Sequence, residues 1–118
     1  MTEDELQAAL DKSLPPEGRH GLFVEECQDQ DVRLRFSPAN ISTATLLALA
    51  EIALRAAAGA DAALTHLSVT MLRAAQPADV VSLSRVIRRD GAIVHAEAWL
   101  FSHAVIEPVL HATATLRR

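Results

Sequence analysis

One stretch of the sequence, NISTATLLALAEIAL from Asn40 to Leu54, predicts a long helix with apolar residues on every side. Asn40 or Ser42 is a typical residue to cap the start of a helix, and Gly59 is typical of the position just past its end. We therefore expect the helix to span residues 42–58. A helix that is apolar all round is expected to be buried, and Glu51 is the one acid within it.

The rest of the chain has the two-residue period of strands. In residues 32–36, apolar side chains alternate with arginines, and residues 23–27 are expected to pair with this strand through a turn at 28–31. Asp90–Gly91 is a strong signal for a tight hairpin. Four further strands are expected over 65–75, 80–89, 92–101 and 108–118, with a loop at 102–107 and a short surface helix over 2–13.

This order of elements predicts an α+β fold in which one curved antiparallel sheet wraps around the central helix. Such a sheet covers the helix on one side only. The other side of the helix and the edge of the sheet still need to be covered, which predicts a homo-oligomer with two-fold symmetry.

Composition narrows the classes of function. The 118 residues have a net charge of −4, which gives no basic face for a nucleic acid. Cys27 is alone, so no internal disulfide can form, and we expect a reducing, cytoplasmic location. The acidic start lacks the basic region of a signal peptide, and no 18-residue stretch is free of charge, so we expect no membrane-spanning segment.

Three stretches together resemble the hotdog-fold acyl-CoA thioesterases, in particular their phenylacetate-pathway branch. They are ISTATLLALAEIAL, LSVTMLRAAQPADVV, and the hairpin VIRRDGAIVHAEAWLF followed by PVLHATATLRR. The resemblance covers about residues 20–118. It implies one hotdog domain over 1–118, with an N-terminal helix and linker at 1–18, a hotdog core at 20–118 and the central helix at 42–58.

The resemblance also gives Glu51 a role, because Glu51 falls where the family has its catalytic Asp or Glu. In that role the carboxylate activates a water molecule or attacks the thioester carbonyl itself. The structural alternative is an ion pair with Arg55 one turn later, worth a few tenths of a kcal/mol, about 0.2–0.5, on an exposed helix. Such a small gain would not offset the desolvation of a fully buried carboxylate.

At the start of the helix, the family match assigns the oxyanion-binding N–H to Thr43, since the first N–H groups of a helix have no partner within it. The family usually has glycine here, where this chain has Ser42-Thr43-Ala44. Ser42 either caps the helix or polarises a substrate group, and Ala44 lies beside the same substrate. Many relatives have Asn or Gln fifteen residues before the acid, where this chain has Phe36; Asn40 lies nearby but out of register.

The spacing of these groups constrains the mechanism. Eight helical residues span about 12 Å at 1.5 Å per residue. One thioester carbon therefore cannot contact both the Thr43 N–H and Glu51 of the same helix. We expect the two groups to come from two chains, with their central helices antiparallel across a dimer.

Three arginines are candidates to bind the phosphates of coenzyme A, because arginine offers paired donors. Arg88 and Arg89 are expected at a hairpin tip where the family often binds the nucleotide, and Arg73 at the end of the preceding strand. The alternative is solubilising charge. The histidines lack acid partners at metal spacing, so we expect no metal site, and Cys27 is expected to be a small core residue.

The leading hypothesis is therefore a hydrolase that cleaves an acyl- or aryl-CoA thioester at a dimer interface. It needs no cofactor, since coenzyme A enters as part of the substrate. Its expected partners are the acyl-CoA and its own copies, as a dimer or a dimer of dimers, with no nucleic acid and no membrane. The second hypothesis is a non-catalytic hotdog protein that binds acyl-CoA or acts as a scaffold. A dehydratase is disfavoured because no histidine lies near the start of the helix.

Overall fold

The computed structural model describes residues 1–28, 31–102 and 107–118, which form three helical segments and six strands. In chain order they are α1 (Glu3–Ser13), the 3-10 helix η1 (Pro16–Gly18), β1 (Phe23–Gln28), β2 (Asp31–Phe36), α2 (Thr43–Ala58), β3 (Ala63–Met71), β4 (Val80–Asp90), β5 (Ile93–Ser102) and β6 (Pro108–Arg117).

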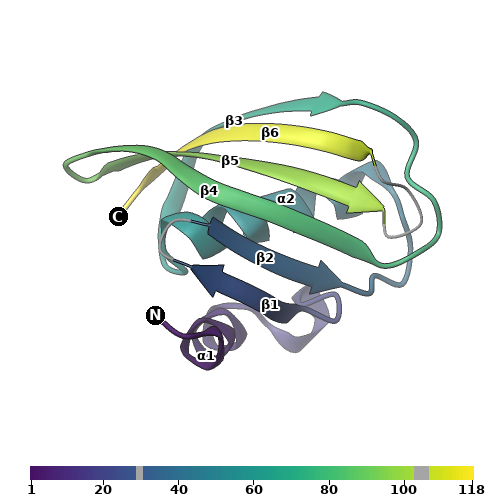
Figure 1. Cartoon of the computed structure of the whole chain (residues 1–118), viewed down its shortest axis with the longest axis horizontal. Coiled ribbons are helices and arrows are strands. Elements are labelled where there is room, and N and C mark those ends of the chain that lie inside the picture. Colours follow the sequence, from purple (N-terminus) through teal and green to yellow (C-terminus); the bar gives the residue numbers. More distant parts are fainter. Residues whose placement is uncertain (29–30, 103–106) are drawn as a thin grey trace.

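The six strands form one antiparallel sheet in the order β1-β2-β4-β5-β6-β3. The sheet curves around α2, which lies across its inner face (Figure 1). This confirms the predicted α+β architecture. The predicted hairpin at Asp90–Gly91 is also confirmed, because β4 pairs with β5 and Gly91 adopts a positive φ of 60°.

Close packing between α2 and the sheet depends on small side chains. Ala50 and Ala53 on the helix are fully buried, as are Ala96 and Ala98 on β5 and Ala112 on β6. α2 packs chiefly against β4 and β5, the two central strands. An alanine presents little bulk, so the helix axis approaches the sheet closely and most of the apolar side chains of both layers lose contact with water.

The predicted alternation along the strands is confirmed. In β2, Val32, Leu34 and Phe36 are buried and the arginines between them are exposed. β6 alternates in the same way along most of its length. The predicted turn residues 29–30 and loop residues 103–106 lie outside the described residues, so the expectations for them stand as predictions.

The two edges of the sheet differ. α1 packs beside β1, with Leu6 and Leu10 buried (Figure 1). Gln7 of α1 binds the backbone of this edge: its Oε1 accepts a hydrogen bond from the Val24 N–H at 2.8 Å, and its Nε2 donates to the Leu22 carbonyl at 3.3 Å. β1 is thus covered by a helix. β3 forms the opposite edge and has only β6 as a strand neighbour among the described residues.

Side chains on the outer face of the sheet form a network across three adjacent strands, β4, β5 and β6. Glu97 on β5 pairs with Arg85 on β4 at 2.7 Å and with His111 on β6 at 3.0 Å, and the His111 ring stacks on Trp99 with centroids 3.9 Å apart. The hydrogen bond with His111 lowers the pKa of Glu97 most, and the Arg85 guanidinium lowers it further, against the opposing effect of desolvation.

None of the helices in the described part of the chain is long and apolar enough to cross a membrane.

Removing a core side chain should destabilise the fold strongly. Leu100 on β5 is fully buried, whereas Leu72, beyond the end of β3, is 41% exposed. We expect Leu100→Ala to lower the free energy of unfolding by about 2.7–5 kcal/mol, and Leu72→Ala by less than about 1 kcal/mol. Urea denaturation at one fixed protein concentration measures both. Equal losses in the two variants would contradict the assignment of Leu100 to the core.

The Glu97 network should make stability depend on pH. Because the folded-state pKa of Glu97 is lowered, the carboxylate contributes stability above its ordinary pKa of about 4.3 and loses it as the pH falls through the folded value. Glu97→Gln should therefore lower stability at neutral pH and flatten its decline below about pH 4.3. Thermal unfolding across this range checks the prediction, with Glu17→Gln, an exposed carboxylate, as the control. The same slope in Glu97→Gln as in the parent would refute it.

Candidate active site

The start of α2 is held by a capping network. The Ser42 Oγ accepts a hydrogen bond from the Thr45 N–H at 3.1 Å, and the Thr45 hydroxyl donates to the Asn40 Oδ1 at 2.8 Å. Of the two uses predicted for Ser42, capping its own helix is the one seen here. Asn40 takes part in the same network through Thr45. Both side chains therefore fix the helix start, and α2 begins at Thr43, one residue after the predicted boundary.

This arrangement leaves backbone donors at the first turn. The first i→i−4 hydrogen bond of the helix runs from the Leu46 N–H to the Ser42 carbonyl, so the N–H of Thr43 has no acceptor within the helix. Thr43 and Ala44 are both exposed. The positive end of the helix dipole lies at the same place, which favours a negative charge there.

Glu51 lies two turns along α2 and is only partly buried. Its side chain is 39% exposed, and its Oε1 lies 3.3 Å from the Arg55 Nη2. The i,i+4 ion pair that the sequence allowed is thus present. As predicted, the sheet of the single chain covers only the inner side of α2. Burial of the other side by a second copy stays a prediction.

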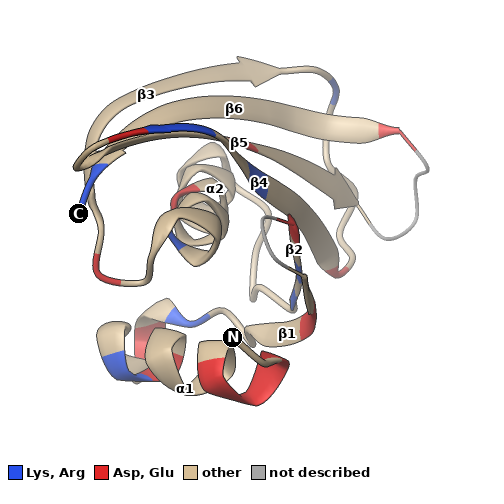
Figure 2. Cartoon of the chain, turned by 60° about the vertical axis from the view of Figure 1, so that its left-hand side comes forward, with Lys and Arg blue, Asp and Glu red and all other residues tan. Residues whose placement is uncertain are grey.

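The uncovered side of α2 is a continuous stripe. Ala44, Leu47, Ala48, Glu51 and Arg55 recur at helical spacing, and none of them is fully buried. Glu51 and Arg55 are the charged residues of α2, and the rest of the helix carries no charged side chain (Figure 2). The Nε of Arg55 is buried with no hydrogen-bond partner among the described residues. An apolar stripe with one ion pair is therefore open on this side of the chain.

A pocket of about 470 Å³ lies next to the start of α2. One segment of its lining is the β2–α2 connection and the other is the β3–β4 connection: Ser37, Pro38, Ala39, Asn40 and Ile41, and Ala75, Pro77, Ala78 and Asp79. Its walls are mostly small residues, and polar and apolar atoms line it about equally. Asn40 is the one predicted site residue among them, and Glu51 lines neither this pocket nor a groove of about 500 Å³ on the outer face of the sheet.

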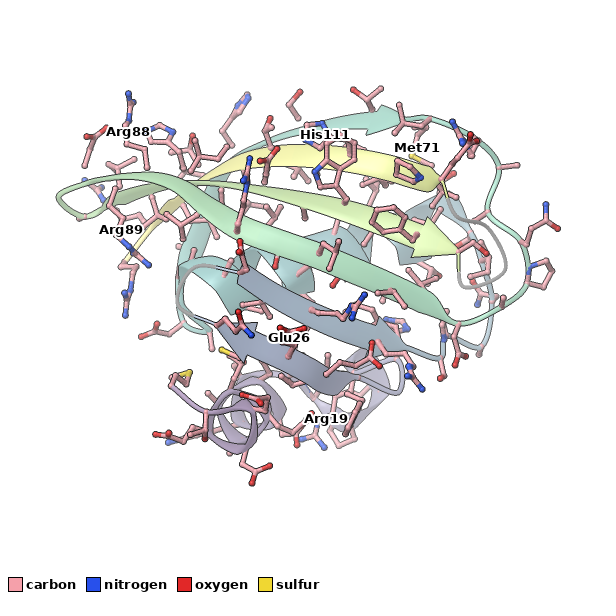
Figure 3. All side chains as sticks on the ribbon, viewed as in Figure 1. Arg19, Glu26, Met71, Arg88, Arg89 and His111 are labelled. Atoms are coloured by element: carbon pink, nitrogen blue, oxygen red, sulfur yellow. The ribbon has the colours of Figure 1, made fainter. Side chains whose placement is uncertain are left out.

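The structure does not bring the three candidate arginines together. Arg88 and Arg89 are exposed at the tip of the β4–β5 hairpin, and Arg88 pairs with Asp90 at 3.0 Å (Figure 3). Arg73 follows the end of β3 and pairs with Glu107. The strand register gives the separation of Arg73 from Arg88. The end of β3 at Met71 is level with Leu100 on β5, through Leu110 of β6, whereas Arg88 is level with His95 on β5. Leu100 and His95 are five residues apart, so the two levels are about 17 Å apart at 3.4 Å per residue.

In the part of the chain that the structure describes, Cys27 and the metal-ligating residue types offer no second candidate centre. Burial raises the pKa of the Cys27 thiol, which disfavours the thiolate needed for a nucleophile. Within residues 1–28, 31–102 and 107–118, no three His, Cys, Asp or Glu residues are grouped to hold a metal ion. The outer network of Glu97, His111 and Arg85 was missed from the sequence, because its members belong to three different strands and only their register joins them.

The sequence itself matches no known family profile and no curated protein. Its fold is nonetheless similar to solved structures over nearly the whole chain. A proposed thioesterase from Silicibacter sp. TM1040 has a TM-score of 0.87 at 19% identity, covering 99% of this chain and 91% of its own.

Two further structures are similar. A proposed thioesterase from Ralstonia eutropha JMP134, described as related to phenylacetic acid degradation, has a TM-score of 0.79 at 18% identity, covering 96% of this chain and 98% of its own. A hypothetical thioesterase from Streptococcus pneumoniae TIGR4, solved with coenzyme A, has a TM-score of 0.77 at 11% identity, covering 97% and 94%. One antiparallel sheet curved around one long helix, shared with these structures, shows that this chain has the hotdog fold of the thioesterases.

Proposed function

We propose that this protein hydrolyses an acyl- or aryl-CoA thioester at a site formed between two copies of the chain, with Glu51 as the catalytic carboxylate. The observation that carries the proposal is the open stripe of α2. It places a half-exposed carboxylate on the same helix as free N–H donors, in a fold that this chain shares with thioesterase structures. A carboxylate and backbone donors are the two groups that thioester hydrolysis needs.

The second copy would cover the open stripe of α2 and the free edge of β3. Leu67 and Val69 on the inner face of β3 are half-buried and Met71 is 46% exposed, so an apolar surface runs along this edge beside the helix. An exposed strand edge next to apolar surface is a ready site for pairing with another copy. β1 is less suited to this role, because α1 covers it.

A site formed by two copies would also bring the two catalytic groups within reach of one substrate. Within one helix, Thr43 and Glu51 are about 12 Å apart along the axis. If the two α2 helices run antiparallel across a two-fold axis, the start of one lies beside the middle of the other. The Thr43 N–H of one copy and the Glu51 carboxylate of its partner then face the same carbonyl.

The reaction would follow from these groups. The Thr43 N–H donates a hydrogen bond to the thioester oxygen as negative charge develops on it. Glu51 takes a proton from a water molecule that attacks the carbonyl carbon, or it attacks the carbon itself and the resulting anhydride is hydrolysed; both routes remain open. The carbon–sulfur bond breaks, the sulfur leaves as the coenzyme A thiol after protonation, and the acyl group leaves as a carboxylate.

The remaining candidates take supporting roles in the proposal. Arg88 and Arg89 contact the phosphates of coenzyme A, and Ala44 lies beside the bound thioester. The pocket lined by Asn40, close to Ser42 at the start of α2, lies where part of the substrate would bind. Arg73 is the weakest candidate, since Glu107 already binds its guanidinium. The coenzyme A in the Streptococcus pneumoniae structure supports this substrate class. The proposal includes a cytoplasmic location, where Cys27 stays reduced.

A second function is favoured by one observation at the helix start. Thr43 is branched and exposed at a position where the thioesterase family that this chain resembles usually has glycine. Its side chain leaves less room for a substrate oxygen to reach the Thr43 N–H. A protein that binds an acyl-CoA without hydrolysing it, or that acts as a scaffold, tolerates this crowding. Calorimetry with coenzyme A and its thioesters distinguishes the two functions, because tight binding without turnover supports the second.

Substitution of Glu51 tests the catalytic role directly. We expect Glu51→Ala to lower the rate of acyl-CoA hydrolysis by about 10²–10⁴-fold, because both proposed routes need the Glu51 carboxylate, either to activate the water or to attack the carbon. Release of the thiol across a panel of acyl-CoAs, followed with a thiol reagent, measures the rate. Glu17→Gln is the control, since this exposed carboxylate lies in η1. An unchanged rate in Glu51→Ala would rule out the proposed mechanism.

Mixing two inactive variants tests whether the site spans two chains. Thr43 is the first residue of α2, where proline is tolerated, and Ser42 before it is extended with φ −104° and ψ 164°. Thr43→Pro therefore removes the N–H donor while keeping the helix, and should lower the rate about 10²–10³-fold.

Co-expression of Thr43→Pro with Glu51→Ala should restore about a quarter of the parent activity. Half of the dimers are then mixed, and one of the two sites in each mixed dimer has both groups intact. The control is the same two variants purified separately and assayed without exchange. If co-expression restores nothing although mixed dimers are present, the two groups belong to the same chain and the proposed geometry is wrong.

A further inference from the structure

Arg55 is the cation of the open stripe of α2, and its hydrogen bonding is incomplete. Its Nη2 lies 3.3 Å from the Glu51 Oε1, whereas a charge-assisted hydrogen bond measures about 2.7–2.9 Å. The Arg85–Glu97 pair on the outer face, at 2.7 Å, is the tighter one. The Arg55 Nε is buried and has no hydrogen-bond partner among the described residues. Arg55 therefore has donors that the single chain does not use.

The neighbours of Arg55 on the stripe do not supply an acceptor. They are Ala44, Leu47 and Ala48, whose side chains cannot accept a hydrogen bond. The Arg55 side chain is 32% exposed, so water reaches it in the single chain. A second copy docked on the stripe, as in the proposed active site, would remove this water. Because a buried charge without partners is costly, Arg55 then needs a further acceptor.

Arg55 is also close to the place where the reacting carbon of the substrate would lie. Reacting atoms approach to about 3–3.5 Å, so the Arg55 Nη2 is within about 7 Å of that carbon if Glu51 attacks directly. A water molecule between Glu51 and the carbon extends this distance to about 10 Å. An extended chain advances about 1.2 Å per bond, so an atom about six bonds from the thioester carbon reaches the guanidinium. The acceptor can thus belong to the acyl group itself.

The electrostatics at this position favour an anionic acceptor. In the proposed dimer, Thr43 of the second copy is level with Glu51. Arg55, four residues further along, then lies about 6 Å in front of the start of the second helix. The positive end of a helix dipole and a guanidinium both favour a negative charge. The planar guanidinium also matches the two oxygens of a carboxylate, to which it donates a pair of hydrogen bonds.

The surroundings favour an aliphatic chain between this carboxylate and the thioester. The sequence has three phenylalanines, one tryptophan and no tyrosine, and none of them belongs to α2 or lines the pocket at its start. Phe36 is in the core, and Trp99 and Phe101 belong to β5. The stripe therefore has no aromatic side chain on which an aryl group could stack. It offers Leu47 and Ala48, against which methylene groups can pack.

We propose that the acyl group of the substrate is a short aliphatic chain that ends in a carboxylate, and that Arg55 binds this carboxylate. The assignment rests on the proposed function and names the substrate class of the same site. The acyl group is held at both ends, by the Thr43 N–H at the thioester oxygen and by Arg55 at the carboxylate. The nucleotide of coenzyme A, which is charged and hydrated, stays at the surface near Arg88 and Arg89.

Two thioesters that differ only at the end of the acyl chain test the assignment, hexanedioyl-CoA and hexanoyl-CoA. We expect the parent protein to have a kcat/KM about 10–100-fold higher for hexanedioyl-CoA, the effect of hydrogen bonds to a charged group. The ratio within one variant cancels any effect of a substitution on Glu51. Arg55→Gln should bring the ratio to about 1 or below, and Arg55→Lys, which keeps the charge without the paired donors, should keep part of it. Arg33→Gln, on the exposed side of β2, is the matched control and should keep the parent ratio.

Equal kcat/KM values for the two thioesters in the parent would overturn the inference while leaving thioester hydrolysis intact. A folded Arg55→Gln with the parent ratio would overturn it too. If Arg55→Gln does not fold, the parent ratio and its decrease in Arg55→Lys decide. If neither thioester is hydrolysed, the proposed function fails, and calorimetry with the same two thioesters tests Arg55 alone. Tighter binding of hexanedioyl-CoA that is lost in the Arg55 variants supports the assignment, and equal binding of both thioesters overturns it.

Discussion

The structure depends on the contact between one apolar helix and one curved sheet. Alanines on both sides allow α2 to lie close to β4, β5 and β6, and the largest buried side chains fill the space around this contact. A sheet covers only one side of a helix, whereas α2 has apolar residues on all sides. The apolar residues of α2 that the sheet does not cover form the stripe that contains Glu51. The same pattern that forms the core therefore also creates the surface on which the proposed function depends.

The architecture could be predicted because its signals are local. The alternation around Val32 and Leu34, the cap at Ser42 and the turn at Gly91 each involve neighbours in sequence, and each is present in the structure. The packing of α1 was only partly foreseen. At the start of α1, the Glu5 N–H donates to the Thr2 hydroxyl and the Thr2 N–H donates to the Glu5 carboxylate, a capping box whose residues are visible in the sequence. The hydrogen bond from the Val24 N–H to Gln7 instead depends on how the helix docks.

The candidate site was less predictable, for a physical reason. The Glu51–Arg55 pair is one helical turn long and was expected as an alternative. Contacts that join distant segments could not be inferred: Glu107 neutralises Arg73, and Glu97 joins His111 through the register of β5 and β6. Register depends on the sum of many packing contacts along two strands, and no short motif encodes it. The separation of Arg73 from Arg88 also follows from strand register, so the sequence did not show that the two arginines lie far apart.

The Glu51–Arg55 pair and the catalytic proposal are compatible. At 39% exposure the carboxylate keeps part of its hydration, so the single chain tolerates it with modest help from Arg55. Docking of a second copy would remove that water, and the cost of an isolated charge would then be high. Arg55, within 3.3 Å on the same helix, offsets only part of this cost. The carboxylate at an apolar interface would therefore still carry a net desolvation cost, which is the feature expected of a group kept for catalysis rather than for stability.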